Sequence, residues 1–197
     1  FVPPPSHGDQ DQRLARALAA IEPGALPRRI VLVSTTGVYG DCQGEWVNET
    51  RPLNPQTARG RRRAHAEQLA RRFGQQQGIP VVALRVPGIY GPGKLPLARL
   101  RSSAPVLAPE FSPWSNRIHV NDLVTVCLAA ARKVDPAPAY NVSDGHPTTM
   151  TDFFFQVADA YGLPRPPAIS WAAAERQLSA EMRSYLAESK RIDNTLM

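Results

Sequence analysis

The distribution of apolar residues along the chain predicts an alternation of strands and helices. Residues 29–34 and 81–86 are continuous apolar runs, which are typical of parallel strands covered on both faces. Shorter runs predict two further strands, at 117–120 and 139–142. Helical spacing of apolar residues, bounded by capping residues or by glycine and proline, predicts helices over 9–21, 57–77, 121–132, 151–161 and 172–178.

The order of these segments predicts an α/β fold with a mainly parallel sheet. Asn121 or Asp122 is expected to cap the third of these helices, since both side chains accept hydrogen bonds from a first helical turn. Residues 41–56 are predicted to be a polar loop, and residues 94–116 to be irregular apart from one helical turn at 97–101. No apolar run approaches the ~20 residues that cross a bilayer, so we expect no membrane partner.

Two loops at the ends of the predicted buried strands are the candidates for chemistry. In parallel α/β sheets, ligands bind beyond the carboxyl ends of the strands. The loop at 34–40 presents three hydroxyl side chains and Tyr39, and the loop at 87–93 combines glycines and prolines with Tyr90. A hydroxyl at a strand end can hydrogen-bond a substrate oxygen, and glycine allows close backbone approach. The alternative is structural: the hydroxyls cap the strand, and the second loop is an ordinary exit from it.

Charge and cysteine usage add little to this picture. The 197 residues suit one domain or one and a half, and the formal net charge is +6. All but three of the 23 basic residues are arginines, which allows anionic partners without choosing among them.

Cys42 and Cys127 show no metal or redox spacing, which favours a reducing, cytoplasmic setting. Neither a metal-ligand cluster nor a Gly-x-Ser-x-Gly elbow is present, so we expect no metal site and no α/β-hydrolase.

A basic segment at 60–67, followed by Arg71 and Arg72, is a candidate for nucleic-acid binding. Basic clusters of this kind are often a solvated helix face. No aromatic residues are interleaved with the arginines and no reader motif is present, so we expect no nucleic-acid partner.

The segments around the two loops occur in an order typical of one enzyme family. A hydroxyl-rich strand end runs into Val-Tyr-Gly at 34–40, an Arg-x-x-x-x-Tyr-Gly-Pro-Gly stretch lies at 85–93, and His-Val-x-Asp lies at 119–122. Tyr-Asn-Val at 140–142 and Ser-Lys-Arg at 189–191 continue the order. Each motif is weak alone. Together they resemble the extended short-chain dehydrogenase/reductases, the NAD-dependent epimerase/dehydratase family.

The resemblance implies a Rossmann-like parallel sheet, present as its back half only, with a small C-terminal substrate lobe. The sheet would comprise 1–93 and 117–133, and the substrate-binding lobe 94–116 and 139–197. Phe1 to Pro5 resembles the family's fourth strand, so the chain is expected to be entered partway. None of the 13 glycines forms the family's Gly-x-x-Gly-x-x-Gly turn, which implies that the N-terminal nucleotide-binding half lies outside this sequence.

The sequence departs from the family's Tyr-x-x-x-Lys pair. Aligning Glu67 with the family's helix places Arg59 at the tyrosine and Arg63 at the lysine. Arginine cannot donate the proton, because it does not deprotonate in proteins. An offset of four puts both arginines on one helix face, so we expect them to converge near Thr35 as an anion site. The alternative is pairing with a neighbouring carboxylate, with Glu67 and Asp41 the candidates.

Two functions follow from the resemblance. The first is an NAD(P)-dependent oxidoreductase or epimerase with an altered proton relay, acting on a sugar nucleotide or another small hydroxyl or carbonyl substrate. The second is a catalytically degenerate NAD(P)-binding sensor or scaffold. The lost Tyr-Lys pair favours the second and the retained loops favour the first. The implied cofactor is NAD or NADP, the implied partner is a small-molecule substrate, and a homodimer is allowed.

The resemblance also implies roles for individual residues. Thr35 would hold the substrate oxygen, and Tyr39 or Tyr90 would be the proton donor. The implied cofactor-binding residues are Pro3, Val33, Ser34, Arg63, Pro87, Gly88 and Ile89. The implied substrate-binding residues are Thr36, Arg59 and His119.

The missing phosphate-binding turn leads to a testable prediction. A polypeptide of residues 1–197 alone should bind NAD(P) weakly or not at all, because the pyrophosphate of the cofactor normally rests on that turn and on the helix N-terminus behind it. Isothermal calorimetry measures the affinity. A micromolar dissociation constant would place the cofactor site elsewhere in the chain.

Overall fold

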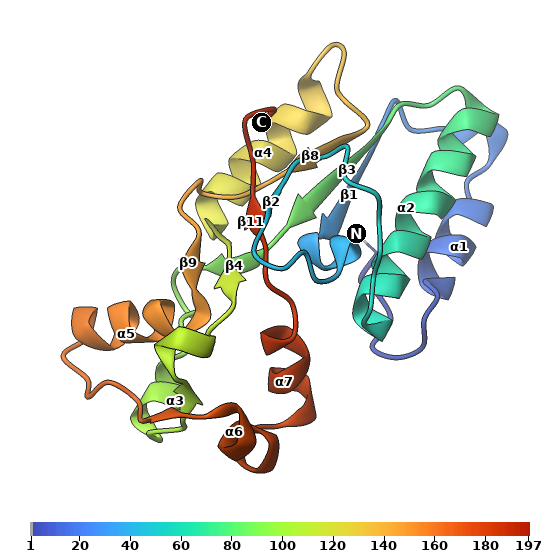
Figure 1. Ribbon diagram of the computed structural model, residues 1–197. Helices are drawn as coiled ribbons and strands as arrows, with labels where there is room; N and C mark the ends of the chain where they lie inside the picture. The colour runs from blue at the N-terminus through green and yellow to red at the C-terminus, as the bar shows by residue number, and fades with distance from the viewer. Residues whose placement is uncertain (1) are drawn as a thin grey trace.

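The structure is a computed structural model that describes residues 2–197. Three parallel strands form the central sheet in the order β1-β3-β8: β1 (Ile30–Thr35), β3 (Val81–Val86) and β8 (Ala139–Asn141) (Figure 1). The strands predicted at 29–34 and 81–86 are confirmed as parallel neighbours, with Thr35 opposite Val86. Because of this register, both strands end at the same level.

Short strands and helices make up the rest of the described chain. The helices are α1 (Gln12–Ala19), α2 (Ala58–Gln77), α3 (Leu97–Arg101), α4 (Val120–Arg132), α5 (Met150–Ala160), α6 (Trp171–Gln177) and α7 (Ala180–Leu186). The short strands are β2 (Trp46–Val47), β4 (Gly88–Tyr90), β5 (Val106–Leu107), β6 (Trp114–Ser115), β7 (Arg117–His119), β9 (Thr148–Thr149), β10 (Ala168–Ile169) and β11 (Arg191–Ile192). Short 3₁₀ helices are η1 (Pro23–Ala25), η2 (Thr36–Tyr39) and η3 (Pro109–Phe111). Within residues 2–197, no helix has the length and apolar character needed to cross a membrane.

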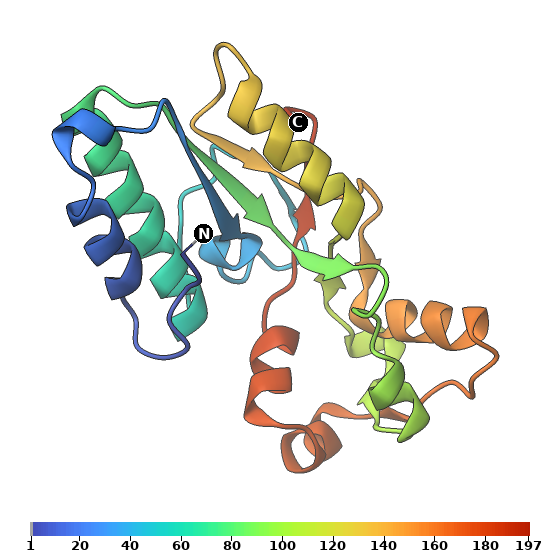
Figure 2. The ribbon, with the colours of Figure 1, turned by 180° about the vertical axis from the view of Figure 1, so that it is seen from behind.

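Helices cover both faces of the central sheet (Figures 1 and 2). Successive residues of a strand point to opposite faces. On one face, Leu84 of β3 belongs to the same apolar cluster as Leu123 of α4. On the other face, Leu32 of β1 packs with Ala70 of α2, and Leu14 of α1 joins that cluster. The α/β class and the Rossmann-like arrangement implied by the sequence are confirmed.

The helix α2 begins and ends where the sequence predicts. The hydroxyl of Thr57 accepts a hydrogen bond from the backbone N–H of Gly60 at 3.1 Å and caps the first turn. Gly78 ends the helix in the left-handed conformation, with φ of 68°, which glycine adopts without a Cβ clash. A Cβ on Gly60 would lie 2.7 Å from the carbonyl oxygen of Gly37. The absence of a side chain at Gly60 therefore lets α2 hold the turn that follows β1.

Helices α3, α5, α6 and α7 form a lobe beyond the carboxyl ends of the central strands (Figure 2). Its interior consists of two apolar clusters. Leu100 of α3 packs with Phe154 of α5 in one cluster, and Ala174 of α6 packs with Leu186 of α7 in the other. Met150 packs against both clusters, so the interior of the lobe is continuous.

The structure differs from the sequence prediction in three elements. Strand β2 lies within 41–56, which was predicted to be a polar loop, because it pairs in parallel with β11 from the far end of the chain. Helix α7 follows α6 where no helix was predicted. Residues 139–141, assigned to the lobe from the resemblance, form β8 and pair with β3 in the central sheet. The rest of the division into a sheet and a substrate lobe stays a prediction.

Two further predictions need correction, one about the cap of α4 and one about a strand in the first five residues. His119, rather than Asn121 or Asp122, caps α4, because Nδ1 of its imidazole accepts a hydrogen bond from the backbone N–H of Asn121 at 3.3 Å. Residues 2–5 form no strand, and they make no ladder with β1. Phe1, which was part of that expected strand, lies outside the described residues.

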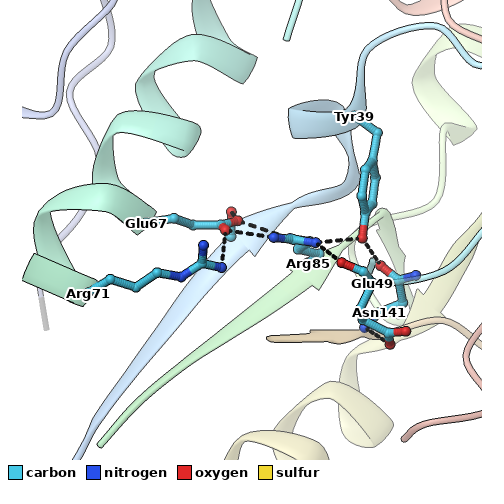
Figure 3. Close-up of polar contacts among 7 residues, drawn as sticks. Tyr39, Glu49, Glu67, Arg71, Arg85 and Asn141 are labelled. Atoms are coloured by element: carbon cyan, nitrogen blue, oxygen red, sulfur yellow. Dashed lines mark hydrogen bonds and ion pairs between the residues drawn. The ribbon is translucent and has the colours of Figure 1, made fainter. Parts of the chain in front are cut away.

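A buried ion pair joins α2 to β3 (Figure 3). Glu67 and Arg85 are 1% and 3% exposed, and Nη2 of Arg85 donates to Oε2 of Glu67 at 3.0 Å. The same carboxylate accepts hydrogen bonds from Ser34 at 2.6 Å and from Arg71 at 3.0 Å. Burial alone would lower the pKa of Arg85, but the hydrogen bonds and charge of Glu67 outweigh burial, so the pKa of Arg85 is raised.

Arg85 also fixes the turn after β1 and the strand β8 (Figure 3). Its Nη1 donates to the hydroxyl oxygen of Tyr39 at 2.8 Å and to the backbone carbonyl of Glu49 at 3.1 Å. The hydroxyl of Tyr39 donates to Oδ1 of Asn141 at 2.8 Å, and the backbone N–H of Asn141 donates to the Glu49 carboxylate at 2.7 Å. One guanidinium therefore connects a helix, a turn and two strands.

Removing one member of this pair should strongly destabilise the protein. Glu67→Leu leaves the Arg85 guanidinium buried without a carboxylate, so we expect the free energy of unfolding to fall by about 3–5 kcal/mol. Arg51→Ala is the matched control, because it breaks an exposed ion pair with Glu45 and should cost no more than about 1 kcal/mol. Urea unfolding measures both values. Equal losses in the two variants would contradict a special role for the buried pair.

Candidate functional site

A cavity of about 530 Å³ lies between the carboxyl ends of the central strands and the lobe. The loops after β1 and β3 leave the sheet at the same level, because Thr35 and Val86 lie opposite each other. One wall therefore combines residues 35–37 after β1 with residues 87–90 after β3. Residues of α5, α7 and the segment that follows α7 complete the lining.

Thr35 organises the turn at the end of β1. Its side chain caps η2, with Oγ1 accepting a hydrogen bond from the backbone N–H of Gly37 at 3.2 Å. Thr36 and Gly37 are buried in this turn, and Gly60 of α2 packs against it. The hydroxyl of Thr35 thus has a fixed position at the cavity, and its proton can be donated to a ligand oxygen.

The second loop forms the small strand β4, which pairs in parallel with β7. Gly88 lies opposite Arg117, so the pairing brings the side chain of Arg117 to the cavity. Ile89 keeps 36% of its surface exposed although it is large and apolar. Pro87, Gly88 and Ile89 therefore offer an uncovered apolar surface to the cavity.

Tyr90 ends this strand and is one of the residues that line the cavity. Its ring meets the ring of His119 edge to face, with 5.3 Å between the ring centres. Burial raises the pKa of the Tyr90 hydroxyl, and the negative charges of Asp144 and Asp122 raise it further. Tyr90 therefore keeps its proton at neutral pH.

The cavity is lined by more positive than negative side chains. Its basic lining residues are Arg59, Lys94, Arg117 and Lys190, whereas Glu188 is the one carboxylate among the described lining residues. Nζ of Lys190 lies 2.7 Å from Oε2 of Glu188. The guanidinium of Arg59 lies 4.0 Å above the centre of the Tyr185 ring. Residues 2–197 contain no cluster of three or more His, Cys, Asp or Glu side chains that could hold a metal ion.

Arg117 is half-buried, and its guanidinium has no carboxylate contact in the described chain. Its Nη1 donates to Ser115 at 2.9 Å and to Thr148 at 3.3 Å, and the guanidinium stacks 3.6 Å from the centre of the Phe153 ring. Burial lowers the pKa of Arg117 to about 10, and the charge of Asp144 offsets this only in part. An anionic group of a ligand would stabilise this charge.

The structure separates the residues implied by the family resemblance into two groups. Those that line the cavity are Thr35, Thr36, Arg59, Pro87, Gly88, Ile89 and Tyr90. Those that lie outside its lining are Pro3, Val33, Ser34, Tyr39, Arg63 and His119. The first group meets the geometric condition for a site, and its roles remain proposals.

Tyr39 and Ser34 belong to the buried network rather than to the cavity. Tyr39 is 1% exposed, and its hydroxyl is engaged by Arg85 and Asn141. Burial is the main cause that raises the pKa of Tyr39. The hydroxyl of Ser34 donates to Glu67. Both hydroxyls are already used inside the fold, which speaks against Tyr39 as the proton donor, whereas cofactor binding at Ser34 stays a prediction.

Arg63 and Arg59 do not converge, so the expected shared anion site is wrong. Nη2 of Arg63 donates to the backbone carbonyl of Val33 at 2.7 Å, and Nη1 lies 3.4 Å from the carboxylate of Asp11. Burial lowers the pKa of Arg63. The carboxylate partner of Arg63 is Asp11, the residue that caps α1, rather than Glu67 or Asp41. Arg59 alone reaches the cavity.

His119 and Pro3 also lie away from the cavity lining. His119 caps α4 and supports the ring of Tyr90, so its effect on a ligand would pass through Tyr90. Pro3 is exposed in an irregular segment. Val33 contributes its carbonyl to Arg63, and its side chain is outside the cavity lining.

Sequence reasoning missed the cavity residues from β7 and from the tail. Arg117 lies two residues before the family-like motif that begins at His119, but nothing in the sequence pattern indicates that its side chain reaches a cavity. Glu188 precedes the family-like Ser-Lys-Arg segment at 189–191, and Lys190 lies within it. The resemblance implied no role for either residue. The available signal in the sequence was the position of the charged residue Glu188 beside the Ser-Lys-Arg motif.

Comparison with known proteins agrees with this architecture. Residues 10–143 match the model of the NAD dependent epimerase/dehydratase family. Over 169 residues the chain is 31% identical to Protein YeeZ of Escherichia coli (strain K12), which covers 84% of this chain and 59% of YeeZ. A functionally unknown conserved protein from Silicibacter pomeroyi DSS is 37% identical with a TM-score of 0.74, over 93% of this chain and 60% of that one.

A more distant structure shows the same fold. MoeE5 in complex with UDP-glucose and NAD is 23% identical to this chain with a TM-score of 0.73, over 95% of this chain and 62% of MoeE5. The chain thus spans about three fifths of the length of the proteins that it matches.

The close approach between Gly60 and Gly37 can be tested directly. Gly60→Ala should destabilise the protein by about 1–3 kcal/mol, because the new Cβ meets the Gly37 carbonyl and displaces the turn that holds Thr35. Gly24→Ala is the control, since a Cβ there meets nothing within 4 Å. Thermal and urea unfolding measure the change. A gain in stability of the kind usual for glycine to alanine in a helix would show that the turn is not held by this contact.

Proposed function

The chain belongs to the NAD-dependent epimerase/dehydratase family, and we propose that it is an oxidoreductase or epimerase-type protein that acts on a hydroxyl or carbonyl group of a sugar nucleotide with NAD or NADP. The observation that carries this proposal is the single cavity lined by Thr35, the Pro87–Ile89 segment and Arg117. A homodimer, a cytoplasmic setting and the absence of a nucleic-acid partner are part of the same proposal.

The Pro87–Ile89 segment suits the nicotinamide end of the cofactor. Pro87 and Ile89 present apolar surface, and Gly88 has no side chain that would cover it. Burying this surface under a flat ring is favourable. When bound, the cofactor supplies a two-electron acceptor or donor at the substrate carbon. Thr35 would hold the substrate oxygen by a hydrogen bond from the facing end of β1.

Arg117 and Arg59 suit the anionic part of the substrate. A diphosphate accepts several hydrogen bonds, and arginine presents its donors in a fixed fork that matches phosphate oxygens. Arg117 has no carboxylate contact within residues 2–197, and Arg59 lies over the ring of Tyr185 at the same cavity. The positive excess of the lining supports an anionic substrate over a neutral one.

Proton transfer cannot follow the family's usual route. Arg59, at the position of the family's tyrosine, does not give up its proton. Of the two tyrosines considered, Tyr90 lines the cavity and Tyr39 does not. The raised pKa of Tyr90 makes it a possible donor to a carbonyl oxygen and a poor acceptor from a hydroxyl.

The second candidate function is a catalytically degenerate NAD(P)-binding sensor or scaffold. The observation that favours it is the fate of the Tyr-Lys positions: Arg59 is stacked on an aromatic ring and Arg63 is bound to a backbone carbonyl. Both functions require ligand binding at the cavity. They differ in turnover alone.

Binding and turnover assays on the full-length protein decide between the two. Calorimetry with NAD, NADP and UDP-glucose tests binding, and proton NMR follows a panel of UDP- and dTDP-sugars with either cofactor. Binding with conversion of any sugar supports the oxidoreductase or epimerase. Binding without conversion supports the sensor. Absence of binding to every cofactor and sugar nucleotide would falsify both.

Arg117 should contribute to the affinity for the anionic substrate. Arg117→Met keeps a long unbranched side chain but removes the guanidinium that stacks on Phe153 and carries the charge, so the dissociation constant of UDP-glucose should rise about 10- to 100-fold, the scale of one hydrogen bond to a charged group. Arg101→Met removes an exposed charge outside the cavity lining and should leave the constant unchanged. Equal affinities in the two variants would remove Arg117 from the substrate site.

A further inference from the structure

Glu188 is the one carboxylate that faces the cavity among its described lining residues. Its side chain is 9% exposed, and Oε2 is held by Nζ of Lys190 at 2.7 Å. The other oxygen, Oε1, is buried and accepts no hydrogen bond from the described chain. A buried carboxylate oxygen without a donor is costly.

The carboxylate lies on the same side of the cavity as Thr35. A Cβ built on Gly37 would lie 3.5 Å from Oγ1 of Thr35 and 3.9 Å from Oε2 of Glu188. Both groups therefore border the small space that glycine leaves open at position 37. A ligand hydroxyl placed in that space can reach the Thr35 hydroxyl and the Glu188 carboxylate together.

The segment that carries Glu188 is held firmly from two sides. The backbone N–H of Ser189 donates to Asp41 at 2.8 Å, and its carbonyl accepts from Cys42 and Gly44. The buried side chain of Asn116 donates to the carbonyl of Lys190 at 3.0 Å. Such fixed backbone positions are what a group that transfers protons needs.

We propose that Glu188 is the acid/base residue of this cavity and replaces the tyrosine hydroxyl that is absent at Arg59. This inference rests on the proposed oxidoreductase or epimerase function. Oxidation of a substrate alcohol removes a proton from its hydroxyl, and Glu188 accepts that proton to become a neutral carboxylic acid. The hydrogen on the substrate carbon leaves with its two electrons to the oxidised cofactor, which yields a carbonyl product and reduced cofactor. In the reverse direction the carboxylic acid returns the proton to the carbonyl oxygen.

Glu188 suits the acceptance of a proton from an alcohol better than Tyr90 does. The raised pKa of Tyr90 favours its protonated form, so it is a poor acceptor for the proton of an alcohol. Lys190, at 2.7 Å, balances the negative charge of the carboxylate and orients it. This arrangement of a charged partner beside the proton-transferring group corresponds in role to the lysine of the family's missing pair.

The test compares Glu188→Gln with the control Glu181→Gln in the full-length protein with its cofactor. Glutamine keeps the size of the side chain and its hydrogen bond from Lys190, but it cannot take up a proton. We expect kcat for the converted sugar nucleotide to fall about 10²- to 10⁴-fold in Glu188→Gln, with KM within about threefold. Glu181 is exposed on α7, so its variant should match the parent protein.

A readout without turnover accompanies the kinetics. Carbodiimide coupling followed by peptide mass spectrometry should modify Glu188 in the free protein, and a bound sugar nucleotide should protect it. Glu181 serves as the internal control and should react equally with and without ligand. Unchanged labelling of Glu188 at saturating ligand would show that the substrate does not reach the carboxylate, and would overturn the proposal.

The remaining outcomes of these experiments also support or contradict the role of Glu188. If Glu188→Gln fails to fold, Gly37→Ala replaces it, because the added methyl meets its neighbours at ordinary contact distances and fills the space beside the carboxylate. It should lower kcat at least about tenfold. Turnover within threefold of the parent protein in either variant overturns the role of Glu188 while leaving the proposed function intact. Binding of cofactor and sugar without conversion of any sugar in the parent protein overturns the proposed function, and the role of Glu188 with it.

Discussion

The ion pair between Glu67 and Arg85 is the interaction on which the arrangement of this molecule depends. Burying two charges is unfavourable unless every donor and acceptor around them is used. Here the Arg85 guanidinium donates to the Glu67 carboxylate on α2, to the Tyr39 hydroxyl and to the Glu49 carbonyl. The Tyr39 hydroxyl in turn donates to Asn141 of β8. Because the donors of arginine form a rigid fork, each of these partners has one place in the fold. The end of β1, and with it the neighbouring cavity wall, is positioned by this network.

The same network explains why one sequence motif serves two purposes. Along the segment from Ser34 to Tyr39, Ser34 and Tyr39 turn inward to the ion pair, whereas Thr35 and Thr36 line the cavity. A hydroxyl engaged by a buried charge is not free to bind a ligand. The inward residues fix the turn, and the outward residues present its chemistry. The motif therefore predicts where a site lies more reliably than it predicts which residues belong to that site.

Elements with strong local signals could be predicted from the sequence, and those that depend on distant pairing could not. Continuous apolar runs identified β1 and β3, and the cap at Thr57 with Gly78 identified α2. Strands β2 and β11 are two residues each and exist because they pair with each other. The helix position of Arg63 was correct, but its direction was set by the carbonyl of Val33, which no sequence spacing reveals. Glu188 reaches the cavity only because β11 brings the tail back.

The pairing of β2 with β11 has a consequence for how the site comes into being. The hydrogen bond from Arg191 to the carbonyl of Gly44 joins residues 147 apart in the sequence. Contacts of such separation are formed late, because the chain must first lose the entropy of closing a long loop. Strands β1 and β3 and helix α2 are already complete in the first half of the chain, so a ribosome exposes them well before it releases the tail. A nascent chain can therefore pair β1 with β3 early, and it acquires the part of the cavity that holds Glu188 only when synthesis has passed β11.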